Sequence, residues 1–239
     1  MVSFIQFVGR LLPAGRVACL GAILAVVFTA CEKPIKRKLM QAIEQNATEE
    51  RFGILYDLET GKEVTGYVKS RAENSRVTDL FTFKNGRKHG VFLAWHENGR
   101  LRQEGYFRDG EEDGLWTTWY KEGGKKWEGR HRNGIKHGSW TMWHLGDEID
   151  DDGDGVVLHG DGPKKAEGSY EDGIKHGKET LWHRNGRVSQ RRQFNKGKRE
   201  GRWAYWDNRG RLMMEEIFRD DELIDTKKSP DFWLQGKGS

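Results

Sequence analysis

The fold is decided by the stretch Gly90-Val-Phe-Leu-Ala-Trp95, because the chain repeats its pattern four more times. The copies read Gly114-Leu-Trp-Thr-Thr-Trp119, Gly138-Ser-Trp-Thr-Met-Trp143, Gly177-Lys-Glu-Thr-Leu-Trp182 and Gly201-Arg-Trp-Ala-Tyr-Trp206. The closing tryptophans are 24, 24, 39 and 24 residues apart, so one interval carries an insertion of 15 residues. Self-similarity at a fixed period of this size is the sequence signature of a repeat protein.

The composition indicates a thin fold with an aromatic core. Of the 239 residues only 35% are hydrophobic while 33% are charged, and ten Trp and eleven Phe supply much of the apolar material. Such a chain has too few aliphatic residues for an ordinary two-layer core. The net charge of +4 arises from Lys, Arg, Asp and Glu that are interleaved along the chain. A nucleic-acid binder should carry a basic patch of one sign, so we expect no nucleic-acid partner.

Each repeat is predicted to be one β-hairpin. A full copy runs from Phe83 to Gly105 and contains two turn signals, Asn85-Gly86 and Asn98-Gly99. Asn-Gly favours tight hairpins, in which both turn residues have positive φ. The stretches between the turns are rich in Trp, Phe, Thr and Tyr, which strands favour. We therefore predict an all-β fold, an elongated and strongly twisted single-layer antiparallel meander of stacked hairpins, with a bulge or a close backbone approach at the repeated Gly90 position.

Alternation along the strands predicts an aromatic row on each face of this sheet. One face should hold the residue two positions after each repeat glycine, which is Glu179 in the fourth copy and elsewhere Phe92, Trp116, Trp140 or Trp203. The other face should hold Trp95, Trp119, Trp143, Trp182 and Trp206. Either row could stack on sugars or hold the apolar side chains of a peptide. The alternative is that the two rows are simply the core of the sheet.

The pattern Gly-x-Trp-x-x-Trp, followed by a glycine turn and Glu-Gly, resembles the bacterial variant of the MORN repeat. Proteins with this variant are often catalogued as YwqK-type antitoxins. The resemblance covers residues 80–219, with an acidic insertion at 145–161, a degenerate capping hairpin at 51–79, and a C-terminal cap and tail at 220–239. It implies the stacked-hairpin fold, a role as an interaction scaffold and contact with membrane lipids.

The N-terminus reads as a lipoprotein signal. Basic residues precede a fourteen-residue apolar run, Val17–Ala30, which is shorter than the roughly 20 residues that span a bilayer. The run ends at Cys31, as in bacterial lipoproteins, where this cysteine is lipidated after cleavage. Residues 1–30 are then the signal peptide and 31–50 the lipidated cysteine and a tether. The alternatives are a plain signal peptide or a buried N-terminal helix.

The acidic insertion resembles a calcium loop in the spacing of its oxygen donors. Asp150, Asp152, Asp154 and Asp161 occupy positions 1, 3, 5 and 12 of such a loop, and Val156 could add its carbonyl oxygen at position 7. Asp161 replaces the longer Glu, and the sequence shows no flanking helices. The alternative is an acidic loop that is simply solvated.

No catalytic arrangement of residues emerges from the sequence, and we expect no enzyme. Equivalent histidines in adjacent repeats should lie about 10 Å apart, too far to share one zinc ion. We expect an envelope lipoprotein, on the periplasmic face or in the outer membrane, that binds a protein, peptide or glycan through its repeats and a membrane through Cys31. A toxin-neutralising protein is the second hypothesis, and an enzyme acting on the cell wall the third.

Overall fold

The computed structural model describes residues 34–146 and 161–230. Cys31, Asp150, Asp152, Asp154 and Val156 lie outside these ranges, as does the C-terminal tail from residue 231. The chain divides into two compact units, Met1–Gln41 and Ala42–Ser239. In the first unit residues 34–41 are helical. Among the described residues no helix has the length and apolar character needed to cross a membrane.

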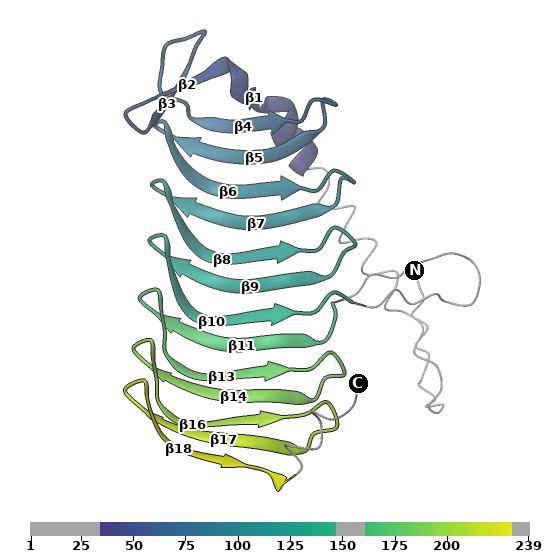
Figure 1. Ribbon diagram of the computed structural model, residues 1–239. Helices are drawn as coiled ribbons and strands as arrows, with labels where there is room; N and C mark the ends of the chain where they lie inside the picture. The colour runs from purple at the N-terminus through teal and green to yellow at the C-terminus, as the bar shows by residue number, and fades with distance from the viewer. Residues whose placement is uncertain (1–33, 147–160, 231–239) are drawn as a thin grey trace, which may run out of the picture. The chain divides into compact units, whose positions relative to one another are not determined.

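The second unit is built on one open antiparallel sheet in which consecutive strands pair in chain order (Figure 1). This confirms the predicted meander of hairpins. Its successive strands are β4 (Gly66–Arg71), β5 (Val77–Lys84), β6 (Arg87–Trp95), β7 (Leu101–Arg108), β8 (Glu111–Trp119), β9 (Lys125–Arg132), β10 (Ile135–Trp143), β11 (Lys164–Glu171), β13 (Gly177–Trp182), β14 (Val188–Asn195), β16 (Gly201–Trp206), β17 (Leu212–Arg219) and β18 (Glu222–Lys228). Two short strands pair beside this path, β12 (Ile174–Lys175) with β11 and β15 (Lys198–Arg199) with β14.

The segment before β4 is ordered further upstream than the sequence suggested. Strand β1 (Ile43–Glu44) pairs in parallel with β4, and after the 3-10 helix η1 (Gln45–Ala47) strands β2 (Thr48–Arg51) and β3 (Ile54–Asp57) form a separate hairpin. The compact unit thus begins at Ala42, whereas the sequence placed a tether up to residue 50. A small hydrophobic core packs at this end of the sheet. It consists of Leu55, Val64, Val68 and Phe83.

The two turns of each repeat differ in geometry. At the left-hand edge of the sheet in Figure 1, Asn85 and Gly86 both have positive φ, 50° and 68°, as a tight hairpin requires. In the turn between β6 and β7, at the opposite edge, Gly99 has positive φ, 83°, and Asn98 does not. The prediction of two such residues at Asn98-Gly99 is therefore wrong. This turn is longer, because His96 donates its backbone N–H to the carbonyl of Arg100 and Gly99 donates to His96.

The glycine that opens each copy bends its strand. Gly114 and Gly138 have φ values of 76° and 70°, a region that favours glycine. The pairing of β10 with β9 shifts register between His137 and Trp140, across Gly138. The bulge predicted at this position is confirmed. Strands β6, β8 and β10 curve near their N-terminal ends, at the left in Figure 1.

The core of the sheet lies on the face that holds Phe92, Trp116, Trp140 and Trp203, which we call the inner face. All four side chains are buried, and Trp116 is only 1% exposed. The rings of Trp116 and Trp140 lie directly over Gly105 and Gly129 of the preceding strands, where an added Cβ would overlap them. The Glu-Gly element of the repeat therefore provides a flat seat for the indole ring of the next strand.

Candidate functional site

Two rows of side chains alternate along the inner face and form a stack of rings. The first row is the core set of Phe92, Trp116, Trp140 and Trp203, and the second row precedes the tight turns and comprises Phe83, Phe107, His131, Tyr170, Phe194 and Phe218. Each of the three first-row tryptophans bridges two second-row rings, whereas Phe92 contacts Phe107 of that row and Phe81. Trp116 lies 5.1 Å from Phe107 and 5.9 Å from His131, and Trp203 lies 5.2 Å from both Phe194 and Phe218, between ring centroids.

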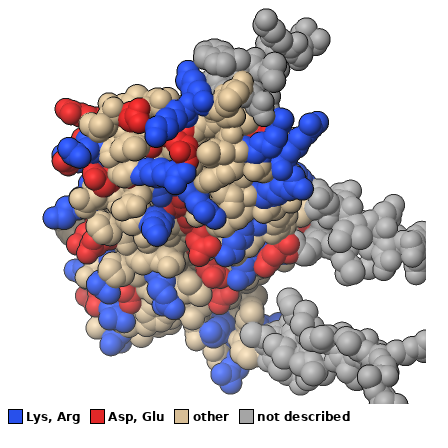
Figure 2. Space-filling model, turned by 90° about the horizontal axis from the view of Figure 1, so that it is seen from below, with Lys and Arg blue, Asp and Glu red and all other residues tan. Residues whose placement is uncertain are grey.

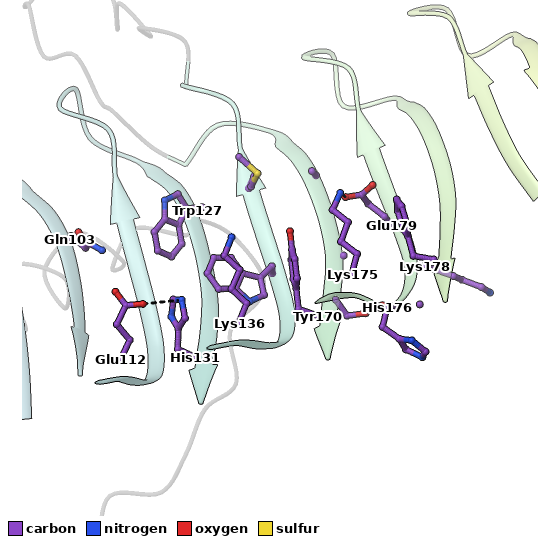
Figure 3. A pocket seen from close by; sticks show the side chains of 17 residues that line it. Gln103, Glu112, Trp127, His131, Lys136, Tyr170, Lys175, His176, Lys178 and Glu179 are labelled. Carbon is purple, nitrogen blue, oxygen red and sulfur yellow. Dashed lines mark hydrogen bonds and ion pairs between the residues drawn. The ribbon is translucent and has the colours of Figure 1, made fainter. Parts of the chain in front are cut away.

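The stack is interrupted once, where β13 carries Glu179 in place of a ring. Tyr170 still contacts Trp140, at 5.8 Å, and Phe194 still contacts Trp203, but no ring of the described residues joins Tyr170 to Phe194. A groove of about 420 Å³ opens at this point, which we call the Glu179 groove (Figure 3). Its walls include Trp127, Trp140, Tyr170, Lys175, Glu179 and Phe194.

Cations surround the carboxylate of the groove. Glu179 is 13% exposed and pairs with Lys175, 2.6 Å from Nζ to Oε1, and with Arg192, 3.4 Å from Nη1 to Oε2. The Lys175 ammonium also lies 5.0 Å from the ring centroid of Phe194. On the opposite wall, Lys136 Nζ lies over Trp140 and Tyr170 at 4.4 and 5.2 Å. These contacts have cation–π geometry.

A buried histidine lies at the far end of the same groove. His131 is 9% exposed, and its ring meets Trp116 and Trp140 edge to face. Its Nε2 lies 3.0 Å from Glu112 Oε2, as Figure 3 shows, whereas Nδ1 has no hydrogen-bond partner in the described part of the chain. Burial lowers the pKa of His131, although the Glu112 carboxylate raises it, and nearby Lys136 lowers it further.

Replacing His131 by Phe is expected to stabilise the protein by about 1 kcal/mol at neutral pH, because Phe fills the same row at Phe107 and Phe194 and no buried nitrogen remains. The lowered pKa means that folding favours neutral His131, so wild-type stability should fall as pH drops below the unfolded value of 6.5. The His131→Phe variant should lose that part of the pH dependence. Urea titrations at pH 5 and 8 measure both effects, and an unchanged pH slope would contradict the assignment.

The five repeat-closing tryptophans are half-buried. Their odd separation from the core rings within each strand sets Trp95, Trp119, Trp143, Trp182 and Trp206 on the outer face. Lys125 Nζ lies 5.5 Å from the ring centroid of Trp143, and the Arg191 guanidinium lies 5.6 Å from that of Trp206. Each of these rings is thus partly covered by neighbouring side chains and partly exposed to solvent.

In the first four copies, the residue after the repeat-closing Trp joins one repeat to the next. His96 Nε2 lies 3.0 Å from the carbonyl oxygen of Trp119, Tyr120 donates its hydroxyl to Trp143 at 2.9 Å, and His183 Nε2 lies 2.9 Å from the Trp206 carbonyl. From the sequence, the histidines of this set were considered only as possible zinc ligands. The Trp residues whose carbonyls accept these hydrogen bonds recur with the period of the repeat. This regularity in the sequence could have revealed the contact between repeats.

Asp207 occupies the same position in the last copy and binds its own turn instead. Its Oδ1 accepts from the backbone N–H groups of Arg209 and Arg211, at 2.9 and 2.8 Å, and its Oδ2 from Arg211 Nε. The backbone N–H of Arg211 is the main cause that lowers the pKa of Asp207, to about 2, together with the Arg211 side chain and the Arg209 N–H.

We expect Asp207→Asn to lower stability at pH 7 and to flatten its dependence on acid. Because the folded pKa is about 2 and the unfolded value is 3.8, the carboxylate stabilises the fold above pH 4 and loses this effect as pH falls towards 2. Melting temperatures of both proteins between pH 2 and 5 test this. Parallel curves would show that Asp207 does not titrate in this way.

The structure describes one of the predicted calcium ligands. Asp161 lies before β11, and its Oδ1 accepts from the backbone N–H of Lys125 at 2.6 Å, so it ties the end of the insertion to the neighbouring hairpin. Within residues 34–146 and 161–230, no group of three or more His, Cys, Asp or Glu is placed to hold a metal ion. Calcium binding by the insertion remains a prediction from the sequence.

Basic and acidic side chains lie side by side on the end of the sheet that Figure 2 shows.

No protein-family model matches the chain, and a search of curated proteins found no relative.

Proposed function

We propose that the protein is a non-catalytic binding module of the bacterial cell envelope, anchored through lipidated Cys31, that takes a peptide or glycan into the Glu179 groove. The observation that carries the binding role is the interruption of the ring stack at Glu179, where a groove replaces core. Aromatic walls with a few charged groups are typical of ligand sites. The anchor rests on the sequence alone.

Arrays of peptides and of cell-wall glycans, probed with the purified full chain, test the binding role. We expect ligands that bind the wild-type protein and lose affinity when Glu179→Trp fills the groove. Glu167→Trp is the matched control, since Glu167 lies next to Gly168 on β11 and points to the outer face. Failure to find any ligand, or ligands insensitive to Glu179→Trp, would refute a role for the groove.

Membrane fractionation with labelled palmitate tests the anchor separately. Wild-type protein should be labelled and sediment with membranes, whereas Cys31→Ala should be unlabelled and released by washing. Retention of the Cys31→Ala protein in washed membranes would contradict the lipid anchor without affecting the groove.

A further inference from the structure

We infer that the Glu179 groove is the site of one missing ring, and that it binds a planar aromatic group, of the size of an indole, that carries a carboxylate. The inference deepens the proposed function and rests on it. It starts from the regularity of the inner face, in which Trp116, Trp140 and Trp203 each bridge two second-row rings.

The second-row rings on both sides of the groove are present and lack only the ring that would join them. Tyr170 contacts Trp140 on one side, and Phe194 contacts Trp203 on the other. A guest ring between them would meet both, as Trp203 meets Phe194 and Phe218 at 5.2 Å. Edge-to-face contacts at such separations are favourable. Three of the four first-row rings are Trp, so a vacancy at this position has the dimensions of an indole.

The seat for that ring has been kept although the ring is absent. Gly168 is the counterpart of Gly105 and Gly129, which lie under Trp116 and Trp140. At Gly168 the three atoms nearest to an added Cβ all belong to Glu179, with the side-chain Cγ at 3.3 Å, so an acidic side chain covers this glycine where a ring covers the other two. A guest ring reaches the glycine floor when the Glu179 side chain turns aside.

The cover for that ring has been kept as well. Lys136 lies over Trp140 and Tyr170, and Lys175 occupies the equivalent position in the next copy, over Phe194. A ring seated on Gly168 would lie beneath Lys175 as Trp140 lies beneath Lys136. The cation–π contact would then be repeated with the guest.

The charges around the vacancy select an anion. Two ammonium groups, those of Lys136 and Lys175, line the groove together with the Glu179 carboxylate, which is already paired with Lys175 and with Arg192. The other carboxylate of the groove, Glu112, is paired with His131. Figure 3 shows His176 and Lys178 directed away from the space beside Tyr170. A carboxylate on the guest ring would therefore find ammonium donors within the groove.

Calorimetric titration of the full chain with four small probes tests the inference. Indole-3-acetate should bind with a Kd of about 0.1–1 mM, a range typical of the weakest drug-sized ligands. Tryptamine, which places an ammonium where the acetate stood, and cyclohexylacetate, which lacks a planar ring, should each bind at least about tenfold more weakly. The dipeptide Gly-Trp with a free carboxylate distinguishes the two sources of the chemistry, a peptide C-terminus if it binds more tightly than indole-3-acetate and a free aromatic acid if it binds less tightly.

The Glu179→Trp variant should bind indole-3-acetate at least about tenfold more weakly, because its own ring fills the vacancy, while Glu167→Trp should match the wild type. Equal binding of tryptamine and indole-3-acetate, or undiminished binding by a folded Glu179→Trp protein, would overturn the inference. The comparison of probes on the unsubstituted protein does not depend on the variant folding.

Failure of this inference can be told apart from failure of the proposed function. If array ligands bind the groove and are lost in Glu179→Trp, but indole-3-acetate does not bind, the missing-ring inference is wrong and the binding role stands. If neither the arrays nor the probes give a ligand, both are wrong.

Discussion

Replacing Trp116 by Ala is expected to lower the free energy of unfolding by about 3–5 kcal/mol, the largest effect of any single substitution considered for this protein. The indole is 1% exposed and contacts the rings of Phe92, Phe107 and His131. Within residues 34–146 and 161–230, no second layer packs on this sheet and could move into the cavity. Urea unfolding followed by circular dichroism measures the loss.

Trp119→Ala is the matched control for this substitution, since it removes the same side chain from the same strand. Trp119 is only half-buried, so its loss should destabilise the protein by clearly less than that of Trp116. Because repeat arrays can unfold in parts, the slope of each transition with urea concentration should be compared as well. Equal losses at the two positions would mean that the inner face is not the core.

The sequence was sufficient to predict the hairpins and the inner row of rings. Period and alternation determine these features, since each β-strand turns successive side chains to opposite faces. It also identified Glu179 as the break in the row. The groove itself could not be predicted, because the consequence of the break depends on how far the neighbouring side chains of Lys175 and Arg192 move into the space.

Two errors at the level of local structure have physical causes. The turn at Asn98 was expected to resemble that at Asn85, because both read Asn-Gly. Asn98 instead accepts from the backbone N–H of Arg100 and donates its amide to the carbonyl of Lys121 in the next repeat, which favours a longer turn. Strands β1 and β2 lie in a stretch that lacks the repeat pattern. They form because β1 pairs with β4 and β2 pairs with β3.

The second large effect concerns the glycines that lie beneath the rings of the inner face. Gly129→Ala is expected to cost about 1–3 kcal/mol, because the added methyl group would overlap the indole of Trp140 and force it from its seat. Gly129 does not have positive φ, so backbone strain does not contribute to the cost. Chemical denaturation of the variant gives the free energy directly.

Gly168→Ala provides the comparison that makes this result specific to the ring. The two glycines occupy the same repeat position, but the atoms nearest to an added Cβ at Gly168 belong to Glu179, with the side-chain Cγ at 3.3 Å, and none of them belongs to a ring. The substitution should therefore change stability by less than about 0.5 kcal/mol, since the Glu179 side chain can give way. If Gly129→Ala and Gly168→Ala were equally costly, the floor of the groove would be as tightly covered as the floor under Trp140, and the vacancy would not exist. If only Gly129→Ala is costly, Gly168 is a seat without its own ring, which is the property that a ligand-binding interruption of the stack requires.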